Sequence, residues 1–533
     1  MDSPTNHARP PAPPAQVLGR AQAGVLLLLL WALATVMQVR NDVFTSDVGA
    51  DPDEPAHVVT ALMMRDYFTT GLPQGEHPLH FAQRYYDHFP KVAIGHYPPG
   101  FYVVAGVWLL PWVSNTSLLI FMGLLAAVLG TVTAAQALRC GLSRGAAWVA
   151  GIWVVLLPLT QKQTMLVMSD TLLATGCLLA IGAFAAFLDR PTAGRALWFG
   201  IYAAATILTK ASAVALALIP VAGILVLGRW SLLLNWRLWL APLPVLATAV
   251  PWTLLTMHIT EEGMQNKSVA EYFPEALRFY ASASVYTFGP VILLGAAVAL
   301  LFGLRTWWRG QAGAHTLAVL LILWVPCLLA LYLVSPTGTS ARYLMPLAAP
   351  LIIGTAWSAS HFWPRPLPGA LACATVALLA LFLLESVPPK QTHGFGLMAG
   401  ELTRRAPGGK VLISSDVRGE GGLIAELALQ SHPRVDSPWT VVRASKFVAS
   451  SSWTGSGYQL AYPDADQLAT AILKDGIEWV VMDRHVPAYY HFPHHDQMQQ
   501  WSAGRTPVLE SQVTRHLDSV PGEIVLYRTA THP

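Results

Sequence analysis

Long apolar runs, separated by short polar connections, fill roughly the first 390 residues of the chain. A run of about 20 apolar residues can span the hydrocarbon core of a bilayer as a helix. The runs lie at 24–39, 117–138, 145–159, 170–188, 196–209, 212–228, 238–257, 287–304, 315–334, 343–361 and 369–387. They predict a polytopic α-helical membrane protein with about eleven transmembrane helices. The first run is predicted to be a retained helix and not a cleaved signal peptide.

The pattern changes after about residue 388. Residues 390–533 hold 27 of the chain's 63 charged residues (33 basic and 30 acidic). Short β-type runs at 410–416, 478–483 and 523–527, with a helical pattern at 464–474, predict a C-terminal α/β domain. The predicted divisions are a tail at 1–22, a membrane domain at 23–388 with a long first outer loop at 40–116, and the α/β domain at 389–533.

Composition supports the membrane assignment. Hydrophobic residues make up 54% of the 533-residue chain, and charged residues make up 12%, about half of the ~25% usual in soluble domains. A soluble fold of this size has too little interior to bury so much apolar surface. This excludes a disordered chain, a disulfide-built secreted scaffold and an ordinary cytosolic enzyme. The four cysteines form no CxxC pair and are predicted to be buried small hydrophobes.

The basic residues predict the orientation. With the N-terminal tail in the cytoplasm, the inner loops carry eleven basic residues against only Asp2 and Asp189. An odd number of spans then places the α/β domain outside, on the periplasmic side of a bacterial-type inner membrane. This alternation requires the apolar stretch Phe101–Val113 to lie at the outer interface without crossing.

The first outer loop carries the richest polar chemistry, with eight acidic residues and five histidines between positions 40 and 98. Its candidate site residues are Asp51, Asp53, Glu54 and His57 in one segment, and His96 and Tyr97 just before a Pro-Pro pair. Paired carboxylates beside a bilayer need cationic or hydrogen-bonding partners. The predicted topology brings such partners to the same side.

Other ionisable residues fall at the predicted outer ends of helices: Asp170, Lys210 and the pair Arg342-Tyr343. Because charges near hydrocarbon cost several kcal/mol unless paired or hydrated, this set predicts a shared polar cavity. Structural explanations exist for each residue alone. Asp170 can cap a helix, Lys210 and Arg342 can snorkel from helix ends, and His57 and His96 can be packed histidines.

Two functions fit such a cavity. In an enzyme with a lipid-anchored phosphodiester donor, a carboxylate takes the proton of an incoming hydroxyl, while Lys and Arg hold the phosphate. In a transporter of a lipid-linked or anionic solute, the same charges would line a path across the membrane. The charges cluster at outer helix ends and not at mid-span, and no inverted repeat is evident, which favours the enzyme.

The ordered set of motifs resembles the polyprenyl-phosphate-dependent membrane glycosyltransferases of the GT-C fold, in the branch of protein O-mannosyltransferases and the lipid A aminoarabinose transferase. The matching elements, over roughly residues 20–390, are Asp53-Glu54-Pro-Ala-His57, Tyr97-Pro-Pro-Gly-Phe101-Tyr102, Asp170, Thr209-Lys210 and Arg342-Tyr343-Leu-Met-Pro346.

The resemblance implies a role for each matched position. Asp53 would deprotonate the acceptor hydroxyl, Glu54 would orient it or bind the donor sugar, and Asp170 would be a second acid of the site. Lys210 and Arg342, with Tyr343, would contact the lipid phosphate. Transfer would proceed with inversion from a polyprenyl-phosphate sugar to a lipid, glycan or protein acceptor, with no nucleotide sugar and no nucleic-acid partner.

The chain also departs from that branch. Where the aminoarabinose transferases have a Glu-Lys pair before Pro-Pro, this chain has His96-Tyr97. The lysine contact to phosphate and the acid that would ligate a metal are therefore absent, so no metal is carried over, and His96 or Lys91 is the candidate replacement for the lysine. Asp51, His57, His96 and Tyr97 remain candidate substrate contacts, and Asp51 could share the carboxylate roles.

Two motifs of the C-terminal part have simpler explanations. The segment 419–422, Gly-Glu-Gly-Gly, follows a strand but is an incomplete dinucleotide fingerprint, and a surface turn is the preferred prediction. His491, His494, His495 and Asp496 could form a metal cluster, but a solvated loop is preferred.

Overall fold

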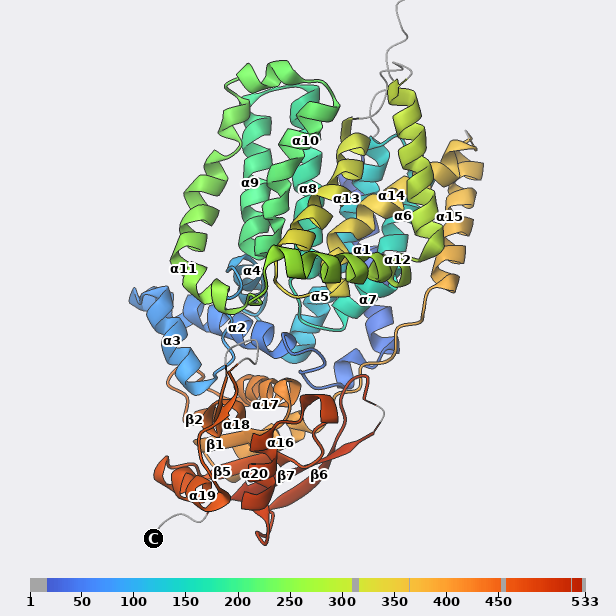
Figure 1. Cartoon of the computed structure of the whole chain (residues 1–533). Helices are drawn as coiled ribbons and strands as arrows, with labels where there is room; N and C mark the ends of the chain where they lie inside the picture. The colour runs from blue at the N-terminus through green and yellow to red at the C-terminus, as the bar shows by residue number, and fades with distance from the viewer. Residues whose placement is uncertain (1–16, 309–315, 364, 452–456, 519, 530–533) are drawn as a thin grey trace, which may run out of the picture.

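The computed structural model describes residues 17–308, 316–363, 365–451, 457–518 and 520–529. A bundle of long helices occupies one end of the molecule and an α/β domain the other, with the first long loop between them (Figure 1). The predicted change in character near residue 388 coincides with the extended segment between the last helix of the bundle and the α/β domain.

The helices of the bundle follow the predicted apolar runs. They are α1 (Arg20–Arg40), α5 (Asn115–Arg139), α6 (Arg144–Leu156), α7 (Pro158–Thr164), α8 (Asp170–Asp189), α9 (Ala193–Thr209), α10 (Leu218–Val226), α11 (Val250–Glu262), α12 (Val269–Trp308), α13 (Thr316–Val334), α14 (Met345–His361) and α15 (Pro366–Leu383). Each of the eleven predicted runs contains helix at its position, so the polytopic helical class is confirmed.

Helix length bears on the number of spans. By length and composition, seven helical stretches of the described chain could cross a membrane, or eight if the bent pair α6–α7 is one span. α9 and α14 contain 17 residues each, about 26 Å of helix, which is at the short limit for a crossing. The count of eleven therefore stays a prediction.

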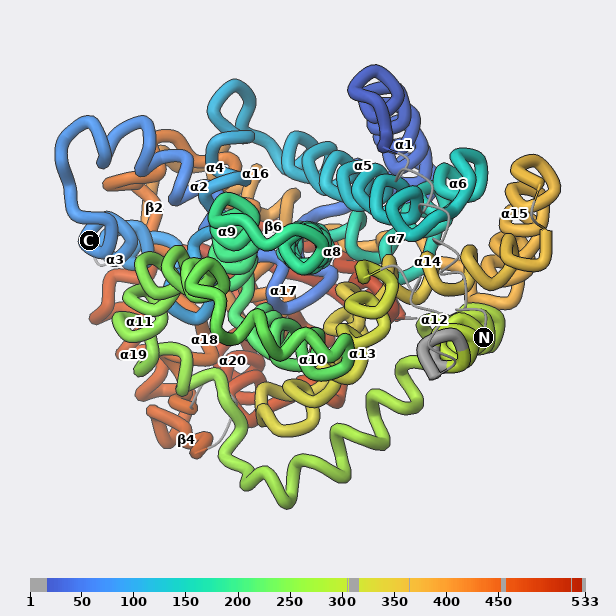
Figure 2. The backbone as a smooth tube through the Cα atoms, turned by 90° about the horizontal axis from the view of Figure 1, so that it is seen from above, coloured from blue at the N-terminus to red at the C-terminus, as the bar shows by residue number. Residues whose placement is uncertain are grey.

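Two helices are interrupted where proline or glycine breaks the backbone hydrogen bonds. The predicted run 145–159 is divided at Pro158 into α6 and α7, which are bent by 56°. α12 turns at Gly289, whose φ of 70° is unfavourable for other residues, just before Pro290. Its first half lies across the outside of the bundle and its second half rises along it (Figures 1 and 2). The predicted run 287–304 corresponds to the second half.

The first long loop is ordered. It contains α2 (Glu54–Asp66), α3 (Pro78–His88) and α4 (Gly100–Trp108), and α2 lies between the bundle and the α/β domain. α4 has nine residues, about 14 Å of helix, which is too short to cross ~30 Å of hydrocarbon. Its exposed Val103, Val104 and Val107 fit the predicted interfacial position.

The C-terminal part contains the predicted α/β sheet. Its elements are α16 (Phe395–Arg405), β1 (Gly409–Ser414), α17 (Val417–Gln430), β2 (Trp439–Arg443), α18 (Ala444–Phe447), β3 (Ala449–Ser450), β4 (Gln459–Leu460), α19 (Ala465–Lys474), β5 (Trp479–Asp483), α20 (Pro493–Ser502), β6 (Leu509–Val513) and β7 (Gly522–Arg528). The order in the main sheet is β2-β1-β5-β7-β6, with β1 parallel to β2 and β5 and with β7 antiparallel to its neighbours.

The two faces of this sheet have different neighbours because successive strand residues point to opposite sides. Val411 and Ile413 share one apolar core with α16, α17 and the first loop. Leu412 faces the other way, into a second core with α19 and α20. The first face therefore fastens the α/β domain to the loop that carries the candidate carboxylates.

Two predictions for this domain were wrong. Residues 419–422 lie in the buried first turns of α17 and not in a surface turn, because α17 packs closely on the first loop: a Cβ on Gly421 would lie 3.0 Å from Pro55. The predicted solvated loop at 491–496 is partly α20, in which His494 and His495 are both buried and His495 lies 3.0 Å from the Ser415 carbonyl just after β1. Because these segments are rich in glycine or histidine, they lack the apolar periodicity from which a helix is predicted.

Candidate active site

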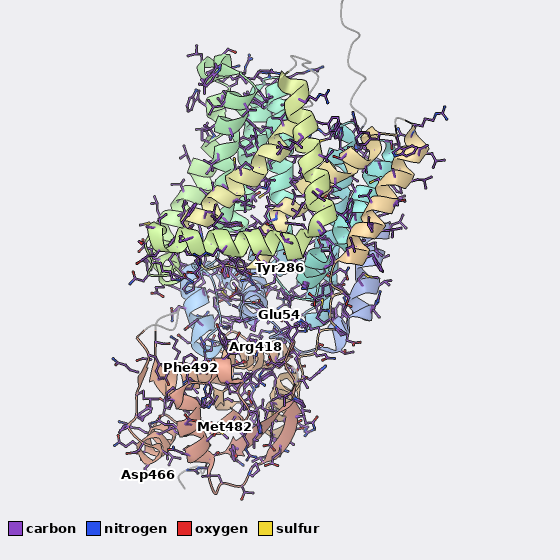
Figure 3. The ribbon with its side chains drawn as sticks, turned by 45° about the vertical axis from the view of Figure 1, so that its right-hand side comes forward. Glu54, Tyr286, Arg418, Asp466, Met482 and Phe492 are labelled. Carbon is purple, nitrogen blue, oxygen red and sulfur yellow. The ribbon has the colours of Figure 1, made fainter. Side chains whose placement is uncertain are left out.

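The candidate carboxylates lie where α2 begins, between the helical bundle and the α/β domain, as the position of Glu54 in Figure 3 shows. Pro55 stands in the first turn of α2, where its missing amide costs no hydrogen bond. Just before the helix, the Asp51 carboxylate accepts a 2.9 Å bond from the Asp53 amide. This turn presents both aspartates on the side facing the bundle cations.

Arg342 is the partner of these aspartates. It lies in the short helical turn Ala341–Leu344, between α13 and α14, and its Nη1 is 3.2 Å from Asp51 Oδ1. Its Nη2 forms an ion pair with Asp53. The Tyr97 hydroxyl donates a 3.0 Å bond to the same Asp53 oxygen. Residues nearly 300 positions apart in sequence thus form one cluster.

A second ion pair lies beside the first. α8 and α9 are joined by a short connection and pack together in the bundle, so the start of one and the end of the other meet at the same end (Figure 2). This brings Lys210 Nζ to 2.6 Å from Asp170 Oδ1. Asp170 follows the N-cap Ser169, which takes the capping position predicted for Asp170 itself. Both charges also complement the dipoles of their helices.

Tyr343 connects the two ion pairs. Its ring centroid lies 4.6 Å from Lys210 Nζ and 5.6 Å from Arg342 Cζ, so both cations contact one aromatic face. Met168 lies 3.9 Å from Arg342 Nη1 through its sulfur. The structure therefore brings together Asp51, Asp53, Asp170, Lys210, Arg342, Tyr343 and Tyr97.

His57 lies beside this cluster, against Tyr97 and Tyr102, and forms no ion pair with the described residues of the cluster. Its Nδ1 is 2.9 Å from the Tyr102 hydroxyl, and its ring centroid is 4.8 Å from that of Tyr97. Burial lowers the pKa of His57 to about 4, so the ring is neutral at neutral pH. The His57 ring therefore packs against the Tyr97 ring, and the Tyr97 hydroxyl donates a hydrogen bond to Asp53.

The surroundings of Asp51 and Asp53 shift their pKa values in opposite directions. Burial raises the pKa of Asp53, but the Arg342 guanidinium, helped by His57 and the Tyr97 hydroxyl, outweighs it and holds the pKa well below its usual range. Burial raises the pKa of Asp51, and Arg342 offsets this only in part. Asp53 is therefore the carboxylate that stays ionised most readily.

Glu54 and His96 lie apart from the cluster. Glu54 Oε1 lies 2.7 Å from Lys390 Nζ, with both side chains fully buried, and Oε2 accepts 3.0 Å bonds from the amides of Gly49 and Ala50. Both carboxylate oxygens are thus occupied. His96 lines a separate cavity. Sequence reasoning missed Lys390, a single lysine after Pro388-Pro389 with no local pattern to mark it.

A metal centre finds no support among the residues that the structure describes, which contain no group of three or more His, Cys, Asp or Glu side chains able to hold an ion. Asp51 and Asp53 direct oxygens to Arg342, and Asp170 directs one to Lys210. In the C-terminal segment, His494 contacts the Tyr458 hydroxyl and His495 the Ser415 carbonyl, while His491 lies 3.4 Å from Asp496.

No protein-family model and no curated protein sequence matches the chain. Solved structures share its fold, among them the three described here. The crystal structure of ArnT from Cupriavidus metallidurans bound to undecaprenyl phosphate has a TM-score of 0.55 and 15% identity, covering 95% of this chain and 98% of that one.

The oligosaccharyltransferase of Archaeoglobus fulgidus, in complex with zinc and sulfate, has a TM-score of 0.51 and 12% identity over 86% of this chain and 68% of that one. The arabinofuranosyltransferase AftD from mycobacteria has a TM-score of 0.51 and 17% identity; 97% of this chain corresponds to only 40% of that one. These are GT-C structures, and the chain has the GT-C fold.

Proposed function

We propose that this GT-C chain is a membrane glycosyltransferase that moves a sugar from a polyprenyl-phosphate donor to a hydroxyl of an extracytoplasmic lipid, glycan or protein. The single observation that carries the proposal is the meeting of Asp53 with Lys210 and Arg342 at one end of the bundle. A base for the acceptor and two cations for a leaving phosphate are the groups that such a reaction needs.

The proposed step is a single displacement. Asp53 accepts the proton of the acceptor hydroxyl while the oxygen of that hydroxyl forms a bond to the anomeric carbon of the donor sugar. The bond from that carbon to the phosphate oxygen breaks, and the polyprenyl phosphate leaves with the additional negative charge. Lys210 and Arg342 stabilise this charge, and inversion follows from attack opposite the leaving group.

Donor binding would change the ion pairs around Asp53. Arg342 forms ion pairs with Asp51 and Asp53. A donor phosphate competes for the guanidinium, and Asp53 then loses part of the attraction that lowers its pKa. Donor binding would thereby make Asp53 a stronger base at the moment when the acceptor needs one.

The location supports a lipid-linked donor. Gly100, at the start of α4, packs against the end of α9: a Cβ there would lie 2.8 Å from the Leu208 carbonyl oxygen, close to Lys210. The exposed valines of α4 extend from this point. A polyprenyl tail can therefore remain in lipid while its phosphate reaches the cations. We place the site on the outer side of a bacterial-type inner membrane.

The test is transfer by the purified full chain in sealed vesicles containing undecaprenyl-phosphate-linked hexoses and pentoses. The expected result is that at least one donor is converted to undecaprenyl phosphate and a sugar-modified product, detected by mass spectrometry. Passage of solute across the vesicle membrane with every donor intact would instead establish the transporter.

Lys210→Met is expected to raise the donor KM about 10- to 100-fold, since a charge-assisted hydrogen bond contributes about 1.5–3 kcal/mol. The acceptor KM should change little. Initial rates at varied donor concentration measure the effect, and Lys474→Met, at an exposed position of α19, is the matched control.

Because Lys210→Met leaves Asp170 unpaired, the double variant Asp170→Asn/Lys210→Met provides a folding-neutral comparison. An unchanged donor KM in both variants would remove Lys210 from the phosphate site.

A further inference from the structure

A second polar cavity, of about 490 Å³, lies between the first loop, the end of α11 and the α/β domain. Tyr86 and Lys91 line it from the loop and Glu262 from the end of α11. Arg443, the last residue of β2, and Lys446 of α18 line it from the α/β domain. None of these residues belongs to the ion pairs around Asp53 and Lys210. The volume is that of a small-molecule site.

The charged side chains of this cavity are mostly basic. Among the described residues that line it, Lys91, Arg443 and Lys446 are cationic and Glu262 is the one carboxylate. Arg443 is paired with Glu420 of α17 at 2.9 Å, and Lys446 donates a 2.7 Å bond to the Ser451 carbonyl. The described charged side chains of the cavity therefore carry a net positive charge, which a bound anion would neutralise.

Lys91 is the least satisfied of the three cations. Its residue is only 6% exposed, yet within the described part of the chain its ammonium group has no ion pair and no hydrogen bond. Burial, together with the nearby Arg443, lowers the pKa of Lys91 to about 8. A buried ammonium group without an anion costs free energy, so the site is incomplete as it stands.

The cavity adjoins the candidate active site. Lys91 is attracted by Asp53 and Asp51, and its Cε lies close to Gly421 where α17 packs on Pro55, next to Glu54. His96, on the cavity wall, is followed directly by Tyr97, which holds Asp53. A molecule seated in the cavity can therefore extend toward the proposed base.

We propose that this cavity binds the acceptor through an anionic group, and that the acceptor is a saccharide carrying a carboxylate or a phosphate. This rests on the proposed function. Lys91 and Lys446 would pair with the anion, and the exposed ring of Tyr86 would pack against the sugar ring. The donor phosphate has its own cations, Lys210 and Arg342, so the two anions occupy separate places.

The test uses the full chain in lipid nanodiscs and isothermal titration with D-glucuronate, D-glucose 6-phosphate and neutral D-glucose. Both anionic probes should bind about 10-fold or more tightly than glucose. Lys91→Met should remove most of that difference, and Lys446→Gln, at a less buried position, should weaken anion binding about 3-fold. Lys210→Met should leave it unchanged, since Lys210 belongs to the donor site.

Equal affinity for glucose and the anionic probes would overturn the proposal. So would anion binding that is lost in Lys210→Met and retained in Lys91→Met and Lys446→Gln, because the anion would then occupy the donor site. Lys91-dependent binding in a protein that transfers no sugar from any donor would support the anion site and refute the proposed transferase function, which separates the two.

Discussion

Asp53→Asn is expected to lower kcat about 10²- to 10⁴-fold, the usual contribution of a positioned general base. Asparagine keeps the size of the side chain and a hydrogen bond with Tyr97, but cannot accept the acceptor's proton. The donor KM should change far less, because Lys210 and Arg342 remain. Initial rates of undecaprenyl phosphate release by the reconstituted full chain measure the effect.

Asp87→Asn, at an exposed position of α3, is the matched control and should retain wild-type rates. Asp51→Asn should cost less than Asp53→Asn, because Asp51 makes the longer of the two bonds to Arg342 and burial favours its protonated form. If Asp51→Asn had the larger effect, the two aspartates would exchange roles.

The pH dependence gives an independent readout of the same residue. Arg342 holds the pKa of Asp53 below the ordinary value of about 3.9, so this group stays ionised above that pH. Because kcat/KM reports the free enzyme, it should show no acid limb from Asp53 between about pH 5 and 7. In the donor complex the phosphate weakens the hold of Arg342 and raises the pKa. The acid limb of kcat should therefore lie at higher pH than that of kcat/KM.

Lys390→Met is expected to lower the free energy of unfolding by about 3–5 kcal/mol, because it leaves the buried Glu54 carboxylate without its cation. The backbone of Lys390 is also held on the first loop, donating a 2.8 Å bond to Asn41 and accepting a 2.6 Å bond from Ser46. Lys390→Met therefore changes the place where the first loop, the segment between α15 and α16, and the α/β domain meet. Chemical denaturation in detergent micelles measures the change.

Glu54→Gln/Lys390→Met removes both charges and should recover most of the stability lost in Lys390→Met, since replacing both members of a buried pair is often near neutral. Lys474→Met is the surface control. A double variant that is stable and active would make Glu54 a positioning residue; one that is stable but inactive would support its predicted contact with the substrate. No loss in Lys390→Met would show that the pair contributes nothing to folding.

Several local features of the chain could be predicted from the amino-acid sequence alone. Apolar runs mark the helices because a side chain in lipid must be apolar whatever its neighbours are. The charges at 170 and 210 fall at adjoining helix ends, since two helices joined by a short connection must run antiparallel. The short β-type runs at 410–416 and 523–527 similarly predicted strands β1 and β7. These features depend on residues close in sequence.

The pairings were decided by the tertiary structure. Glu54 and Asp53 are adjacent and equally acidic, yet one is enclosed with Lys390 and the other faces Arg342. No periodicity distinguishes them, because burial of a carboxylate depends on which distant element packs over it. The sequence by itself determined where the helices and strands lie and where charged residues fall near their ends. Only the tertiary packing of the first loop, against the helical bundle on one side and the α/β domain on the other, decided which of its charges pair and where the basic cavity around Lys91 forms.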